Sequence, residues 1–63
     1  MTAKEFDKIL WQRGDVIETT DGREYEVLEI DFHNRLIGGT PDGDIYELIA
    51  LPEIKRIVNE QTK

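Results

Sequence analysis

Turn-forming residues divide most of this chain into short segments, and that division limits the fold more than any other feature. The turn signals are Asp21-Gly22, His33-Asn34, Pro41–Asp44 and Pro52-Glu53. They recur at the roughly 8–12-residue spacing that is typical of all-β folds. Asp-Gly is a preferred pair for a two-residue hairpin, and Pro-Asp-Gly favours a tight turn. The sequence therefore predicts one mainly β domain over residues 1–63, which is short enough to hold a single small core.

Five strands follow from these boundaries. They are expected over residues 15–20, 23–32, 35–40, 45–51 and 54–58. The fifth is ambiguous, because its apolar residues also fit helical spacing and Pro52 is acceptable in a first helical turn. Residues 53–60 are therefore open to either a strand or a helix. Residues 59–63 are expected to form a polar tail.

The apolar face changes side within the second expected strand. Tyr25 and Val27 share one face. The apolar residues that follow them share the other face: Leu28, Ile30 and Phe32. Because alternate side chains of a strand point to opposite faces, both sets can be buried only if the strand bends, bulges or passes between two sheets. This predicts an irregularity near Leu28 and a place for Phe32 in the core.

A short helix is expected over residues 3–12, before the first strand. Thr2 and Glu5 have the spacing of a capping box, in which each side chain satisfies a free backbone N–H group at the helix start. Apolar residues at helical spacing would form its buried face: Ala3, Phe6, Ile9 and Leu10. Arg13-Gly14 then provides a cation and a conformationally free residue, which favours a helix end there.

Acidic residues dominate the middle of the chain. The net charge is −6, but residues 15–47 carry ten acidic side chains against two arginines, which gives that block a charge of −8. Nucleic acid is not expected as a partner, because phosphate binding depends on clustered Lys and Arg. An acidic surface attracts basic partners and otherwise stays solvated. We therefore expect a protein partner, and a basic one where charge contributes to recognition.

The residue types that enzymes use as nucleophiles are scarce. The chain has no Cys, no Ser and one histidine, His33. These absences exclude a disulfide framework, a Cys-ligated zinc site and thiol or seryl catalysis. Asp42 and Asp44 flank Gly43, but turn chemistry accounts for both. No catalytic residue, cofactor or metal site is therefore expected, and the lack of a long apolar run predicts a cytoplasmic protein without a membrane span.

Binding is the remaining class of function, and two kinds of residue are candidates for it. Aromatic residues dominate the energetics of protein interfaces. Tyr46 is expected at the surface, whereas Trp11 lies beside the apolar face of the helix. Trp11 is assigned either to the core, which we favour, or to an exposed patch. The turn after the second strand adds polar candidates: Asp31, His33, Asn34 and Arg35.

Two features of the third and fourth expected strands concern packing between backbones. Gly38-Gly39 is typical of a sharp bend or a close backbone approach, and no helix start follows that would make it a phosphate cradle. Residues 45–51 carry apolar side chains on both faces, whereas an edge strand that packs on the core with one face needs them only on that face. A domain this small, without disulfides or metals, has little stability in reserve. Self-association into a homo-oligomer is therefore expected, strengthening with salt as repulsion between acidic blocks is screened.

The order of these elements resembles the small SH3-like barrels, and among them the Sm-like proteins. The resemblance rests on Asp21-Gly22-Arg23, on the segment 31–37 and on the closing segment 51–58. It implies that Asp31 and Asn34 lie in the loop that binds RNA bases in Sm proteins. The chain is also similar, in architecture and acidity, to the Rho-binding antiterminators, which are acidic monomers that act by binding a protein.

The sequence thus predicts a mainly β fold, a five-stranded SH3-like or Sm-like barrel with a short N-terminal helix. We expect a non-enzymatic protein-binding or regulatory module. The alternative that the resemblance implies is an oligomeric, Sm-like RNA-binding protein.

Overall fold

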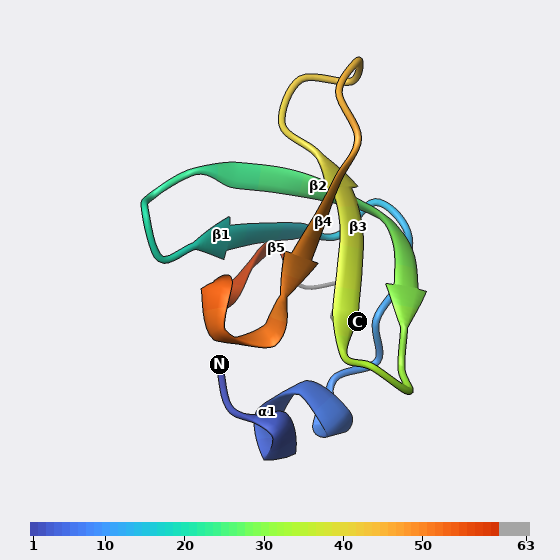
Figure 1. Cartoon of the computed structure of the whole chain (residues 1–63), viewed down its shortest axis with the longest axis vertical. Helices are drawn as coiled ribbons and strands as arrows, with labels where there is room; N and C mark the ends of the chain where they lie inside the picture. The colour runs from blue at the N-terminus through green and yellow to red at the C-terminus, as the bar shows by residue number, and fades with distance from the viewer. Residues whose placement is uncertain (60–63) are drawn as a thin grey trace.

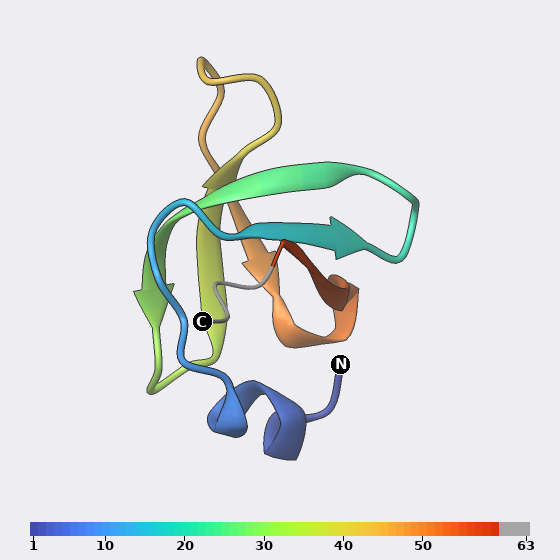
Figure 2. The ribbon, with the colours of Figure 1, turned by 180° about the vertical axis from the view of Figure 1, so that it is seen from behind.

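Five antiparallel strands form a single sheet in the computed structural model of this protein, which describes residues 1–59. The strands are β1 (Val16–Thr19), β2 (Glu24–Asp31), β3 (Leu36–Thr40), β4 (Glu47–Ala50) and β5 (Ile54–Asn59). Their order across the sheet is β4-β3-β2-β1-β5, so the last strand returns to pair with the first (Figures 1 and 2). The mainly β prediction is confirmed. Residues 60–63 of the expected polar tail lie outside the described residues.

Residues with positive φ shape the connections. Gly22 has a φ of 89° in the β1–β2 turn, and the N–H of Thr19 donates to Arg23 O at 2.8 Å and closes the hairpin. The hairpin predicted at Asp21-Gly22 is therefore confirmed, but Thr19 and Arg23 enclose three residues instead of the expected two. In the β2–β3 turn the left-handed residue is Arg35, with a φ of 55°, a region that non-glycine residues occupy uncommonly.

β2 is irregular where its apolar face changes side. Its register with β3 shifts between Val27 and Glu29, which leaves Leu28 without a partner on β3. Tyr25 and Val27 are buried before this point, and Ile30 packs against the core beyond it. The irregularity predicted from the change of apolar face is confirmed.

Phe32 lies outside the core, so its predicted burial is wrong. β2 ends at Asp31, and Phe32 falls in the turn that follows, where its side chain is 60% exposed. Its ring meets the ring of Phe6 edge-on, with 6.4 Å between the centroids. β2 therefore ends at Asp31, one residue before Phe32, the last residue of the alternating apolar pattern.

The helix α1 (Ala3–Lys8) begins as predicted and ends early. Both bonds of the capping box are present, because Glu5 N donates to Thr2 Oγ1 and Thr2 N donates to Glu5 Oε1. Ile9 already has extended backbone angles, so the predicted continuation to residue 12 is wrong. Leu10 is consequently 87% exposed instead of lying on the buried face of a longer helix.

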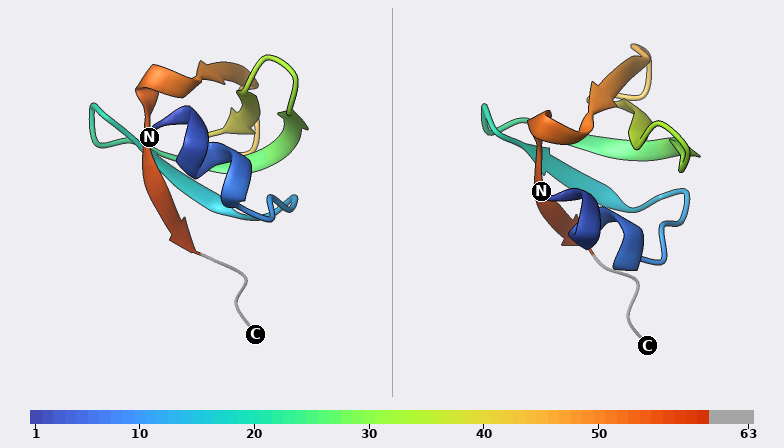
Figure 3. Two further views of the ribbon diagram at one scale, coloured as in Figure 1. Left: turned by 90° about the horizontal axis from the view of Figure 1, so that it is seen from below. Right: turned by 60° about the horizontal axis from the view of Figure 1, so that its bottom comes forward.

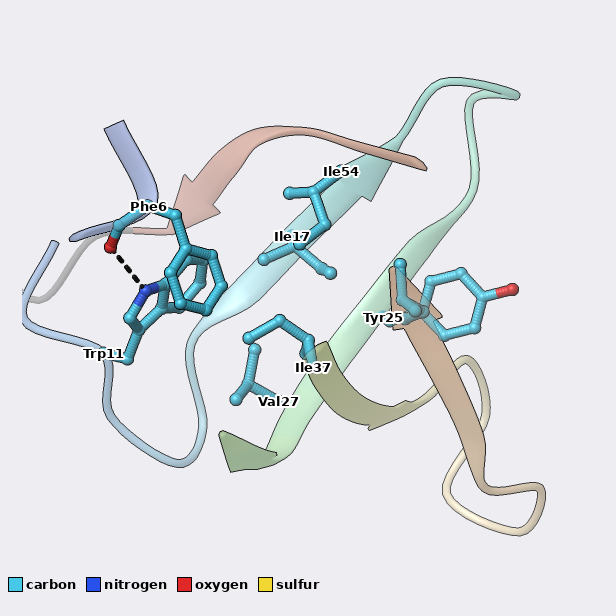
Figure 4. Close-up of a cluster of buried hydrophobic side chains, with 8 residues drawn as sticks. Phe6, Trp11, Ile17, Tyr25, Val27, Ile37 and Ile54 are labelled. Atoms are coloured by element: carbon cyan, nitrogen blue, oxygen red, sulfur yellow. Dashed lines mark hydrogen bonds between the residues drawn. The ribbon is translucent and has the colours of Figure 1, made fainter. Parts of the chain in front are cut away.

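The core lies between α1 and the sheet (Figure 4). Its buried apolar residues come from the helix, the connection after it and all five strands: Phe6, Trp11, Ile17, Tyr25, Val27, Ile37, Ile49 and Ile54. The indole N–H of Trp11 donates to Phe6 O at 3.0 Å, and the two ring centroids lie 5.0 Å apart. This bond turns the chain back onto the core, which explains why α1 does not continue through Trp11.

α1 lies across one end of the sheet (Figure 3), and hydrogen bonds on either side of it hold it there. The amino nitrogen of Met1 donates to Ile54 O, at the start of β5, at 2.6 Å. The guanidinium of Arg35 donates two hydrogen bonds to Asp7, at 2.7 and 3.0 Å. The helix therefore connects β5 with the β2–β3 turn across one end of the strands.

β4 and β5 are the two edges of the sheet. A short 3-10 helix, Leu51–Glu53, joins them and contains Pro52 in its first turn. The segment after it, residues 54–59, forms a strand, so the strand is the correct one of the two alternatives left open by the sequence. Residue 60 lies outside the described residues. No ladder joins β4 to β5 within residues 1–59, so closure of the sheet into a barrel stays a prediction.

Candidate binding surface

The polar candidates that follow β2 come together in one turn. Asp31 accepts hydrogen bonds from the backbone N–H and from the side-chain amide of Asn34, both at 3.0 Å. The backbone bond from Asn34 is the main reason why the pKa of Asp31 lies below its usual value. Arg35 is held by Asp7, and His33 is exposed. The shape of the turn and its attachment to α1 therefore account for three of the four candidates.

The two aromatic candidates lie in different environments. Trp11 is 7% exposed, and its indole N–H is bonded to Phe6. It belongs to the core, which is the assignment that the sequence favoured. Tyr46 precedes β4 directly and is 49% exposed, as expected of a surface aromatic.

Tyr46 lies across the outer face of the sheet. Its hydroxyl donates to Glu29 Oε1 on β2 at 2.8 Å, and this bond raises the pKa of the tyrosine. Gly38 on β3 is paired with Glu29, and any side-chain carbon at Gly38 would overlap the Tyr46 ring. The missing side chain at Gly38 thus makes room for the ring. The close backbone approach predicted from Gly38-Gly39 is found at Gly39, where a Cβ would lie 2.8 Å from the backbone oxygen of Glu26.

Apolar side chains extend this outer face along β3 and β4. Leu48 is paired with Gly38 and is 62% exposed, so it shares a face with the Tyr46 ring. Leu36 and Ala50 are paired with each other in the same register and are half-buried. We call the four apolar residues the β4 face: Leu36, Tyr46, Leu48 and Ala50.

Carboxylates border the β4 face on its β2 side. Glu29 and Asp31 are both exposed, and their pairing with β3 places them on the same face of the sheet. Sequence reasoning did not single out Leu48 or Leu36, because residues 45–51 are apolar on both faces and alternation alone does not say which face is covered. The glycine pair of β3 was the available signal, since it marks where a side chain crosses the outer face.

The inner side of β4 borders a hollow with a volume of about 290 Å³. Two of its lining residues, Tyr25 and Ile49, are 5% and 2% exposed. Three lining residues carry carboxylates: Asp21 in the β1–β2 turn, Glu47 on β4 and Glu53 in the 3-10 helix. The hydroxyl of Tyr25 donates to Glu47 Oε1 at 2.9 Å. We call this feature the hollow.

Arg23 places a cation beside the hollow. Its Nε lies 3.6 Å from Asp21 Oδ2, and both side chains are well exposed. The nearby Tyr25 side chain, together with the carboxylates of Asp21 and Glu47, raises the pKa of Arg23. A guanidinium group of the chain itself therefore already lies beside Asp21, one of the carboxylates that line the hollow.

A recess of about 340 Å³ lies between α1 and β5, at the opposite edge of the sheet. Apart from Glu5, which belongs to the capping box, its lining is apolar and basic: Met1, Ile9, Ile57, Lys8, Lys55 and Arg56. Arg56 is paired with Glu18 on β1 at 2.8 Å. The two edges of the sheet therefore differ in charge, with acidic residues around β4 and basic residues around β5.

The described residues contain no group of three His, Cys, Asp or Glu side chains that is placed to hold a metal ion. Among the helices of residues 1–59, none has the length and apolar character needed to cross a membrane. Comparisons with protein-family models, with curated proteins and with solved structures find no match for this chain.

Proposed function

We propose that this protein is a non-enzymatic binding module that recognises a basic protein partner through the β4 face. The observation that carries the proposal is an exposed apolar surface on an edge strand with carboxylates around it. Tyr46 and Leu48 are 49% and 62% exposed on that surface. Ile45, 52% exposed, adds apolar area just before β4.

The position of β4 favours recognition of another chain. It is paired with β3 on one side and has no strand on its other side within the described residues. Edge strands with free backbone groups and exposed apolar side chains are sites where other chains add to a sheet. Aromatic residues such as Tyr46 contribute strongly to interface energetics.

The charge around β4 favours a basic partner. Asp42 and Asp44 lie in the turn that leads to β4, and Glu29 and Asp31 border its outer face. The block of residues 15–47 has a charge of −8, which raises the local concentration of cationic partners and slows the approach of acidic ones.

We also propose that the sheet is an SH3-like or Sm-like barrel. Three observations support this architecture: the return of β5 to β1, the irregularity in β2 and the short 3-10 helix between the edge strands.

The alternative is RNA binding by the β2–β3 turn, which the resemblance to Sm proteins implies. Asp31 and Asn34 are bonded to each other there, and Arg35 is paired with Asp7. A base or phosphate would have to replace these contacts. Filter binding with RNA at 50 mM and 200 mM salt tests this alternative, because phosphate contacts must produce a steep loss of affinity with salt. We expect no measurable binding at either concentration.

Affinity capture from a lysate of the native host tests the proposed function. The wild type is compared with Leu48→Glu, which places a charge on the β4 face, and with Leu10→Glu, which changes an equally apolar residue that is 87% exposed near α1. We expect a basic protein that is retained by the wild type and by Leu10→Glu and lost with Leu48→Glu. Equal capture by all three would contradict a role of the β4 face.

A further inference from the structure

We propose that the segment bound at the β4 face is an extended strand that alternates apolar residues with Lys or Arg, pairs with the free edge of β4 and places one cation in the hollow. This inference rests on the proposed function and adds the conformation and the chemistry of the partner segment. It follows from three features that meet at β4: an edge that pairs with no strand of residues 1–59, an apolar outer side and an acidic inner side.

The alternation of β4 separates the two sides. Leu48 points to the outer face with Tyr46, whereas Glu47 and Ile49 line the hollow on the inner face. Side chains of a strand that is added beside β4 must follow the same alternation, because neighbouring strands share the pleat of the sheet. Every second side chain of the partner would therefore meet the β4 face, and the others would meet the hollow.

The lining of the hollow suits a long cationic side chain. Tyr25 and Ile49 provide buried apolar surface for the methylene groups of Lys or Arg, which pack on such surfaces while the charged end stays near water. Tyr25 lies at the end of the core cluster away from Phe6 and Trp11 (Figure 4). The carboxylates of Asp21, Glu47 and Glu53 are the groups with which Lys and Arg form the strongest hydrogen bonds.

Arg23 shows which kind of group this site attracts. Its guanidinium lies next to Asp21, and Tyr25 and Glu47 also favour its charged form. It remains well exposed, so it lies beside the hollow without filling it. A partner cation would take over these contacts, and Arg23 would then compete with it for the same carboxylates.

Binding of a synthetic peptide tests the cationic contact. The probe is acetyl-Val-Lys-Val-Lys-Val-Lys-Val-amide, and the same peptide with Glu in place of Lys is the negative control. Glu47→Gln should lower the affinity for the Lys peptide about tenfold, which corresponds to one charged hydrogen bond. Arg23→Gln should raise it, because the competing cation is removed.

Glu24→Gln is the matched control for the change of charge. Glu24 is an exposed carboxylate on β2 that does not line the hollow. We expect its effect on the affinity to be much smaller than that of Glu47→Gln. Equal effects of the two variants, or equal binding of the Lys and Glu peptides, would overturn the inference.

Hydrogen exchange tests the strand pairing. The bound peptide should slow exchange of backbone amides in Glu47–Ala50 and leave those of β5 unchanged. Alternate peptide nitrogens point to the same edge of a strand, so methylation of either the Val or the Lys nitrogens blocks one edge of the peptide. At least one of the two methylated peptides should lose binding. Full binding by both, or no protection in β4, would overturn the pairing.

The two proposals fail in different ways. If capture of the host protein depends on Leu48 but the Lys peptide does not bind, the partner has another conformation or chemistry and this inference is wrong. If capture is the same with Leu48→Glu, the proposed function itself is wrong. Protection of β5 instead of β4 would place the peptide at the opposite edge and would also contradict this inference.

Discussion

The phenol ring of Tyr46 lies across Gly38, in the space that a side chain at position 38 would occupy. The ring is further fixed by the hydrogen bond from its hydroxyl to Glu29. A glycine on β3 therefore determines where the exposed aromatic residue of the β4 face is held. Gly39, the next residue, faces the other side of β3 and lies against backbone instead of a mobile side chain.

We predict that alanine costs more stability at Gly39 than at Gly38. A Cβ at Gly39 would lie 2.8 Å from the backbone oxygen of Glu26, which is fixed in the β2–β3 ladder, so overpacking should cost about 2 kcal/mol. At Gly38 the obstacle is the exposed ring of Tyr46, which can move away. Thermal denaturation of the two variants measures the difference, and equal losses would contradict it. Gly38→Ala should also weaken binding at the β4 face.

Gly22→Val should destabilise the β1–β2 hairpin by about 1 kcal/mol or more. Gly22 has a φ of 89°, where a β-branched residue is strained, although there is open space around its Cα for a side chain. Gly22→Asn is the matched control, because Asn tolerates left-handed backbone better than other residues with a side chain. Equal melting temperatures of the Val and Asn variants would argue against backbone strain as the cause.

Substitution of Trp11 should show that it supports the core. Trp11→Ala should unfold much of the population, since removal of a buried Trp typically costs about 3–5 kcal/mol. Trp11→Phe should cost less but leave the carbonyl of Phe6 without its donor. Circular dichroism during denaturation measures both variants. Leu10→Ala, at an exposed position next to it, should change stability by less than about 0.5 kcal/mol.

The β2–β3 turn should make the stability of the fold depend on pH, through the carboxylate of Asp31. Hydrogen bonds from Asn34 hold the pKa of Asp31 below its usual value of 3.8, so they favour the ionised, folded form. This contribution is complete above the unfolded pKa and is lost as the pH falls through the lower, folded pKa. Asp31→Asn should therefore lower the melting temperature at pH 7 and make little difference at pH 2.

Thermal melts in moderate salt test this dependence, with Asp44→Asn as the control. The carboxylate of Asp44 accepts no hydrogen bond from the described residues, so its replacement should not produce the same dependence on pH. An effect of Asp31→Asn that is equal at both pH values would show that the turn is held by something other than the ionised carboxylate.

Salt should act in opposite directions on self-association and on binding of the Lys peptide. Copies of the chain repel one another through their acidic blocks, and at physiological ionic strength this repulsion is screened beyond about 8 Å. Light scattering should therefore show more association as salt is raised. Affinity for the Lys peptide should fall, because screening weakens attraction between exposed opposite charges. If self-association and affinity for the Lys peptide both rose or both fell with salt, the β4 edge would not act as an acidic surface.

Local patterns were sufficient to predict several parts of this fold. The capping box of Thr2 and Glu5, the hairpin at Gly22 and the irregularity at Leu28 each depend on residues that are neighbours in the chain. The end of α1 could not be predicted in this way. It depends on tertiary packing, because Trp11 both bonds to Phe6 O and packs its ring against the Phe6 ring in the core.

The candidate surface was predicted only in part for the same reason. Tyr46 was expected at the surface, but its place over Gly38 depends on the register of three strands. The exposure of Leu48 depends on that register as well. For Phe32 the alternation of β2 predicted burial, but the residue lies beyond the end of the strand and is exposed.

The return of β5 to β1 has a consequence for the order in which this chain folds. Glu18 and Arg56, which meet across these strands, are 38 positions apart, whereas Asp31 and Leu36 pair across a four-residue turn. Closing the longer loop costs more chain entropy, so we expect β1, β2, β3 and β4, which are joined by short connections, to associate first and β5 to join last. Until it does, the buried position of Ile54 is empty and α1 lacks its attachment to β5. Completion of the core should therefore wait for β5, the last of the described strands in chain order.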